Sequence, residues 1–217
     1  MKTKRTRRGS RALTVVELLL VLVACGLLLA LLLPATARRH NHTAQIRCLN
    51  NLKQVSLGML LFRYDNEESP WNLPSTKGGT SDFKTSSEVY RHFAAASNDL
   101  GSPKILTCRS DASRQPAVLF SMLANTNISY FINIDATAAE TIQPLAGDRR
   151  ILGGAISNDF LLFVSKKSPV RWGPNIHNET AIGNLAMTDG SADGLSSKDL
   201  PKRFASNTLP VMRLAIP

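Results

Sequence analysis

The chain has 217 residues, of which 43% are hydrophobic and 19% charged, and this balance fits one packed globular domain with an appendage. The formal net charge is +10, but six cations precede residue 12 with no acid among them, which leaves 20 basic against 16 acidic residues beyond that point. No basic stripe with interleaved aromatic residues follows, so the charge does not indicate a nucleic-acid partner.

A long apolar run follows the basic start of the chain. Residues 18–33 include no polar side chain. The stretch 13–35, at ~1.5 Å per helical residue, is long enough to cross a ~30 Å hydrocarbon core. The cations before residue 12 place the N-terminus in the cytoplasm. The sequence therefore predicts a single-pass membrane anchor, with the rest of the chain on the opposite side.

Signal peptides, membrane anchors and prepilins all begin with a basic segment followed by an apolar run. Ala35 and Ala37 form an A-x-A pattern that suits signal-peptide cleavage. Glu17 argues against this class, because an ionised carboxylate at the edge of an apolar run is costly and a signal peptide gains nothing from it.

The residues around Glu17 favour one of these three classes. Residues 11–19, Arg-Ala-Leu-Thr-Val-Val-Glu-Leu-Leu, resemble the cleavage motif of type IV prepilins and type II secretion pseudopilins, with Ala12 in place of the usual Gly and Leu13 in place of the usual Phe. The resemblance implies that prepilin peptidase cuts between Ala12 and Leu13. It also implies that Glu17 pairs, in a filament, with the new N-terminal ammonium of a neighbouring subunit.

The same resemblance implies a location and a set of partners. The chain is expected in the bacterial inner membrane with its N-terminus cytoplasmic and its C-terminal domain periplasmic, or in a periplasmic or cell-surface filament. The expected partners are prepilin peptidase, homologous pilin-like subunits and the membrane itself, and the role is structural, not enzymatic. Two alternatives remain open, an uncut membrane-anchored periplasmic binding module and a secreted enzyme released after Ala37.

An amphipathic helix is predicted over residues 36–66, beyond the apolar run. Pro34 is expected to kink the helix where the two parts join. The sequence Asp65-Asn66, followed by Ser69-Pro70, is expected to end it. The apolar residues of the helix recur at spacings of three and four: Leu49, Leu52, Val55, Met59 and Phe62.

Three further segments narrow the resemblance to bacterial prepilin-like proteins with a C-terminal processing-associated domain. Residues 48–54, Cys-Leu-Asn-Asn-Leu-Lys-Gln, resemble a stretch typical of that group, and residues 105–111 and 129–133 resemble two others. His177 and the later Asp189-Gly190 are similar to its C-terminal histidine and Asp-Gly signature, with eleven intervening residues in place of about nine.

The cysteines allow either a disulfide or free thiols. An oxidising periplasm would let Cys48 and Cys108 pair, which stabilises by up to ~4 kcal/mol on the loop-entropy model. No histidine or acid lies at zinc-ligand spacing around the pair, so a metal site is not expected there. Cys25 lies within the apolar run and is expected to be a small apolar filler.

The overall expectation is an α+β, pilin-like fold in which a long N-terminal helix, first transmembrane and then amphipathic, packs on a small antiparallel β-sheet domain. Residues 1–12 are the leader, 13–35 the transmembrane part, 36–66 the amphipathic part and 67–217 the globular domain. Residues 67–104 read as a surface loop region with a short helix around 87–96. Strands are predicted at 128–134, 160–164 and 185–188, with a tight turn at 189–190.

The sequence offers little support for a catalytic site or a bound cofactor. No nucleophile or second base accompanies His177 in an acid-base or triad pattern, so no catalytic residue is assigned. Asp189 and Asp193 are weak candidates for calcium ligands, because turn chemistry explains both. No other cofactor is expected.

Overall fold

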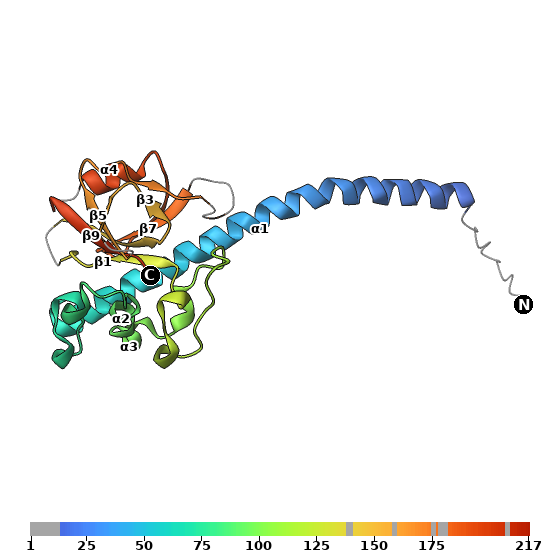
Figure 1. Cartoon of the computed structure of the whole chain (residues 1–217). Coiled ribbons are helices and arrows are strands. Elements are labelled where there is room, and N and C mark those ends of the chain that lie inside the picture. The colour runs from blue at the N-terminus through green and yellow to red at the C-terminus, as the bar shows by residue number, and fades with distance from the viewer. Residues whose placement is uncertain (1–13, 138–140, 158–159, 175–176, 178–181, 207–208) are drawn as a thin grey trace, which may run out of the picture. The chain divides into compact units, whose positions relative to one another are not determined.

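The computed structural model describes residues 14–137, 141–157, 160–174, 177, 182–206 and 209–217, and within these it gives no side-chain positions for 30–42. The chain forms two compact units, residues 1–40 and 41–217. One long helix, α1 (Val15–Asn66), runs through the boundary between them, and every described strand belongs to the second unit (Figure 1).

The prediction of a transmembrane section over residues 13–35 is wrong. Within the described residues, none of the helices has the length and apolar character needed to cross a membrane. The single-pass inner-membrane location is corrected accordingly, and with it the pilin-like fold built on a transmembrane helix.

The second half of α1 packs into the globular unit along one face. Leu49 is half-buried, and Lys53 and Gln54 on the opposite side are exposed. Gly58 allows close packing against α3 (Ser97–Leu100), because a Cβ at this position would come within 2.7 Å of Leu100 Cδ2. The buried apolar residues of this face recur at helical spacing: Leu52, Val55, Met59 and Phe62.

The predicted short helix around residues 87–96 is confirmed by α2 (Tyr90–Ala94), but the surface loop predicted for the rest of 67–104 is wrong, because eight short helices follow α1 in the stretch 67–129, which the structure describes without a gap. They are η1 (Pro70–Asn72), η2 (Ser75–Lys77), η3 (Ser81–Phe83), α2, α3, η4 (Pro103–Leu106), η5 (Phe120–Met122) and η6 (Asn125–Asn127). Trp71 and Phe93 from this segment are fully buried. The Trp71 indole N–H donates a 2.9 Å hydrogen bond to the Ala136 carbonyl. The segment therefore supplies part of the core.

Nine strands make up the described β-structure. They are β1 (Tyr130–Asn133), β2 (Pro144–Asp148), β3 (Ile151–Leu152), β4 (Ala155–Ser157), β5 (Leu161–Ser165), β6 (Arg171–Trp172), β7 (Ile182–Met187), β8 (Ala192–Ser196) and β9 (Val211–Ala215). Seven form one sheet in the order β4-β5-β9-β1-β2-β7-β8, and β3 pairs with β6 separately. Each described pairing is antiparallel. The fold is α+β, with a larger sheet than the small one predicted.

β1 lies near the middle of the sheet and is buried on both faces. Tyr130 and Ile132 belong to a core shared with α1, whereas Phe131 between them belongs to a second core that includes Trp172 and Phe204. This alternation follows the two-residue period of a strand. α1 and the short helices therefore cover one face of the sheet, and α4 (Leu200–Ala205) covers the other (Figure 1).

His92 in α2 is a buried histidine, and its Nδ1 lies 2.8 Å from the Thr80 hydroxyl. Burial, and after it the positive charge of Lys84, lowers the pKa of His92 to about 4 from the ordinary 6.5. Between these two pH values the unfolded chain binds a proton that the folded chain does not. Protonation therefore favours unfolding, and stability rises with pH across this window.

We expect the free energy of unfolding to fall by up to about 3 kcal/mol as the pH is lowered from about 7 to about 4 because of His92. Urea denaturation at a series of pH values measures the decrease. His92→Gln cannot titrate in this range and should show a shallower decrease than the wild-type chain. Equal slopes for the two proteins would assign the acid sensitivity to other groups.

Candidate functional site

α1 begins with a capping box formed by Thr14 and Glu17. Glu17 Oε2 accepts hydrogen bonds from the Thr14 backbone N–H at 2.9 Å and hydroxyl at 3.0 Å. The Glu17 N–H in turn donates to Thr14 Oγ1 at 3.3 Å. The backbone bond first, and then the hydroxyl bond, lower the pKa of Glu17. The carboxylate is thus held ionised in the first helical turn, where the helix dipole favours an anion.

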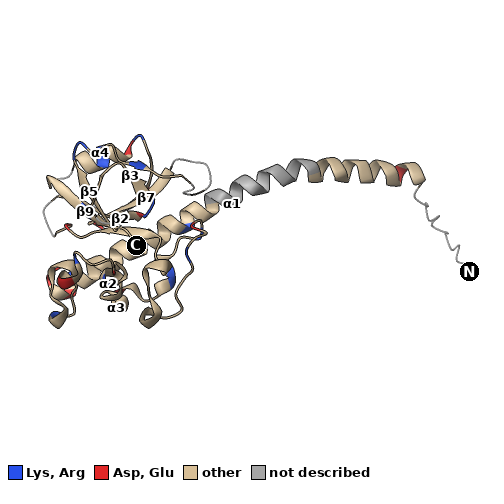
Figure 2. Ribbon diagram, in the orientation of Figure 1, with Lys and Arg blue, Asp and Glu red and all other residues tan. Residues whose placement is uncertain are grey.

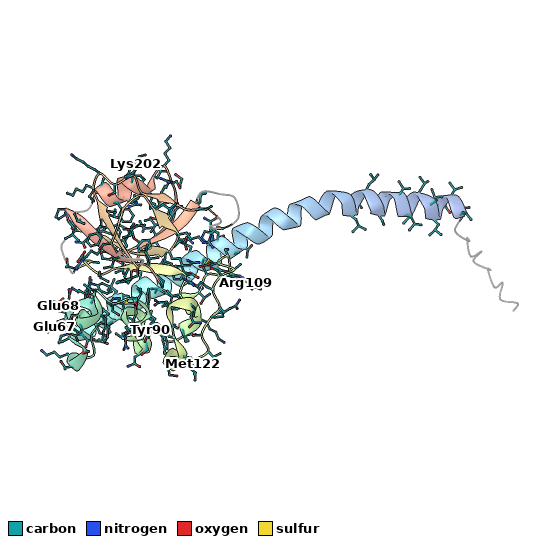
Figure 3. The ribbon with its side chains drawn as sticks, in the orientation of Figure 1. Glu67, Glu68, Tyr90, Arg109, Met122 and Lys202 are labelled. Atoms are coloured by element: carbon teal, nitrogen blue, oxygen red, sulfur yellow. A yellow bond between two sulfur atoms is a disulfide. The ribbon has the colours of Figure 1, made fainter. Side chains whose placement is uncertain are left out.

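The section of α1 from Val15 to Leu29 exposes apolar side chains. Their exposed fractions run from 53% for Val23 to 80% for Val15. Glu17 is the one charged residue in this section, as Figure 2 shows. The side chains project from opposite sides of the helix, so the section has no polar face (Figure 3). A helix that is apolar all round is normally buried against another surface.

Three residues singled out from the sequence cannot be placed. Ala12 and Leu13, at the predicted cut, lie outside the described residues. Pro34 lies within the bounds of α1 but among the residues whose side chains are not described, so the predicted kink is not tested.

Cys48 and Cys108 form the expected disulfide. It joins α1 to the segment after η4, across 60 residues of sequence, with the two Cα atoms 5.0 Å apart. The buried Tyr130 hydroxyl donates a 3.2 Å hydrogen bond to the Cys48 carbonyl and fixes the helix side of this junction. Cys25 is free and exposed. Such a disulfide is typical of a protein in an oxidising compartment.

His177 lies directly against this disulfide. Its Nδ1 is 4.0 Å from Cys108 Sγ, and its Nε2 is 3.0 Å from Asp148 Oδ2. The side-chain amide nitrogen of Asn184 lies 3.0 Å from the same Nε2. All four residues are buried: Cys108 lies in the segment after η4, Asp148 in β2, Asn184 in β7 and His177 in the chain before β7. The fold thus aligns sulfur, imidazole and carboxyl in a row.

A small hollow of about 20 Å³ adjoins this row, lined in part by Cys108, His177 and Asp148. This volume accommodates about one water-sized ligand. Asp111 and Arg149 form another wall and are joined by a 2.7 Å ion pair. Burial raises the pKa of Asp111, but its hydrogen bonds from Arg149 more than offset this, so the pKa is lowered. Arg150 lines the same hollow and lies 3.8 Å from this carboxylate, so the wall is polar and holds two cations for one anion.

The two calcium candidates, Asp189 and Asp193, each interact with a different partner. Asp189 Oδ1 accepts hydrogen bonds from the N–H and hydroxyl of Ser191, at 2.9 and 2.6 Å, in the turn between β7 and β8. Asp193 forms an exposed 3.1 Å ion pair with Arg203 of α4. Turn chemistry and a surface ion pair account for both residues, and neither belongs to the group of potential metal ligands found among the described residues.

The partners of His177 were missed from the sequence. The sequence pattern linked it to Asp189-Gly190, whereas the structure surrounds it with Asp148, Asn184 and Cys108. Asp148 and Asn184 meet because β2 pairs with β7, and the Asn184 backbone N–H donates a 2.6 Å bond to Asp148 Oδ2. This contact depends on the strand register, and no local sequence motif predicts that register.

No family model, curated protein or solved structure matches this chain. The resemblance to prepilins and pseudopilins therefore stays a prediction based on short motifs. Function has to be argued from the two features described above, the apolar start of α1 and the cluster around the disulfide.

Proposed function

We propose that the chain is a prepilin-like structural subunit of a type II secretion pseudopilus or a type IV pilus-like filament. In this proposal prepilin peptidase cuts between Ala12 and Leu13, and the subunits assemble through α1. The observation that supports it best is the exposed apolar section Val15–Leu29, in which Glu17 is the single charged residue.

The exposed section of α1 offers a large gain on assembly. Burial of apolar surface is worth roughly 25 cal/mol per Å², so several side chains of this size, covered together, can drive association. A helix that is apolar all round can be contacted by several neighbours at once. Contacts between different surfaces of like subunits do not close on themselves and so build open helical filaments.

Glu17 gives this apolar contact its register. Among the described residues of one subunit, Thr14 is the residue that donates hydrogen bonds to this carboxylate, and Glu17 is exposed. A cut before Leu13 would create an ammonium one residue ahead of this capping box. In a filament the ammonium of one subunit would pair with the carboxylate of the next, so that neither charge is buried alone.

The cut is tested by mass spectrometry of the mature N-terminus in a bacterial host that contains prepilin peptidase. We expect a product that begins at Leu13, lost when Ala12→Trp blocks the small-residue site and retained in the matched control Gly9→Trp. An intact wild-type chain, or one that begins after Ala37, would overturn the proposal.

Assembly is tested separately with Glu17→Gln. Removing the carboxylate leaves the ammonium unpaired at a cost of about 3 kcal/mol, or roughly a hundredfold in the association constant. Cross-linked oligomers, counted in sheared and purified material, should fall accordingly. Thr14→Ala is the matched control, because it weakens the helix cap by about 1 kcal/mol but keeps the carboxylate, and it should still assemble. An equal loss of cross-linked oligomers in both variants would show that Glu17 acts only as a helix-capping residue.

A further inference from the structure

Three buried side chains with metal-binding atoms meet at the junction of α1 and the sheet. The Sγ atoms of Cys48 and Cys108 and a ring nitrogen of His177 lie within 4.8 Å of one another. This is the one such group found among the described residues. All three residues are buried, so an ion held there would be shielded from solvent.

We infer that, when the Cys48–Cys108 disulfide is reduced, Cys48, Cys108 and His177 form a binding site for one zinc ion. The inference is independent of filament assembly. It assigns a second chemical state to the same junction: a disulfide under oxidising conditions and a metal centre under reducing ones.

The ligand set and its spacing suit zinc. Zinc binds thiolate sulfur at ~2.3 Å and imidazole nitrogen at ~2.0 Å in tetrahedral geometry, which places two bound sulfurs ~3.8 Å apart. Reduction frees the two sulfurs to reach this separation, and His177 Nδ1 already lies 4.0 Å from Cys108 Sγ. Small side-chain rotations would therefore assemble three ligands, with the adjoining hollow able to hold a water molecule as the fourth.

Asp148 prepares His177 for this role. Its Oδ2 accepts the Asn184 backbone N–H at 2.6 Å and lies 3.0 Å from His177 Nε2. A carboxyl oxygen that acts as an acceptor favours the tautomer with its proton on Nε2, which leaves the lone pair of Nδ1 facing the sulfurs. With this tautomer the Asn184 side-chain amide, which lies 3.0 Å from the same Nε2, turns its otherwise unpartnered oxygen toward the ring N–H. Metal-binding histidines commonly donate their second ring nitrogen to a carboxylate in this way.

The backbone at His177 supports the same assignment. Its φ angle is +50°, in the left-handed region that residues other than glycine seldom adopt. Such a conformation costs of order 1–3 kcal/mol and is concentrated at binding and catalytic sites, where the side chain must be aimed precisely. Here it directs the imidazole into the interior beside Cys108.

The exchange between the two states balances with a phosphine as reductant. The S–S bond breaks, each sulfur becomes a thiol, and the phosphine takes the oxygen of one water molecule to become its oxide, the water hydrogens ending on the thiols. Zinc binding then releases both thiol protons. Because each sulfur can bond either to its partner or to zinc, zinc should slow reoxidation to the disulfide.

The test uses the full chain with Cys25→Ser, which removes the third cysteine, and Co²⁺ as the optical probe. After phosphine reduction we expect one Co²⁺ per chain with thiolate-to-cobalt absorption, displaced by Zn²⁺, and no such band before reduction. His177→Ala should weaken binding about a hundredfold, and Asp148→Asn by 10–100-fold, the range typical of an outer-shell partner. His92→Gln, a change at another buried histidine, should bind as tightly as the parent.

Two results would overturn the inference. One is a reduced chain, folded by circular dichroism, that binds no Co²⁺. The other is undiminished affinity in His177→Ala. If reduction alone unfolds the chain, Zn²⁺ should restore the folded spectrum and raise the melting temperature, because it binds only the folded site. Failure of Zn²⁺ to do either also overturns it.

Discussion

Replacement of Cys108 by alanine is expected to lower the free energy of unfolding, measured under oxidising conditions, by about 4 kcal/mol. The disulfide closes a loop between residues 60 positions apart, and the chain-entropy relation for that length gives this magnitude. Guanidinium denaturation with the oxidised parent as reference measures the loss. Cys48→Ala removes the same cross-link and should lose a similar amount.

Two comparisons separate the cross-link from lost packing. Because one bond is removed in every case, the double variant should lose little more than either single variant. Cys25→Ala, at the exposed free cysteine, should change the free energy by less than about 0.5 kcal/mol. A loss below about 1 kcal/mol in Cys108→Ala would show that the disulfide contributes little to stability.

Trp71→Ala should be the most damaging single truncation in the segment between α1 and the sheet. The indole is 1% exposed, and its removal from a core of this kind costs about 3–5 kcal/mol. The Ala136 carbonyl would also lose its hydrogen-bond donor, at about 1 kcal/mol. Chemical denaturation followed by circular dichroism measures the change without depending on tryptophan fluorescence.

Trp71→Phe is the matched control. Phenylalanine retains most of the aromatic packing but cannot donate to Ala136, so it should lose clearly less than the alanine variant. If the two substitutions cost the same, the hydrogen bond and not the packing anchors this segment. If neither costs more than about 1 kcal/mol, the short helices fold independently of the core.

The amphipathic part of α1 was predictable because it depends on local periodicity. The stripe from Leu52 to Phe62 is read from spacings of three and four, and the structure buries it. The disulfide was predictable because so few cysteines were available. Trp71 was not recognised as a core residue, because the surrounding Ser, Lys and Gly residues of 67–104 gave no periodic signal.

The site around His177 could not be predicted for a different reason. Its neighbours Asp148 and Asn184 lie on strands that are close only because of the sheet register, and Cys108 arrives from beyond the short helices. The apolar run over residues 18–33 led instead to a prediction that the structure contradicts. Hydropathy predicted a membrane span over residues 13–35, whereas no helix in the described part of the chain meets the length and apolar character that a span requires.

The position of β9 has a consequence for the order in which the protein can be made. This strand follows all other described strands in the chain, yet it lies between β5 and β1 in the sheet. A ribosome therefore finishes both flanking strands before the strand that joins them exists. Until residues 211–215 emerge, β5 and β1 present unpaired edges, which are the surfaces that aggregate most readily. A released chain that ends before residue 211 would therefore hold two separate half-sheets, each with one of these edges unpaired.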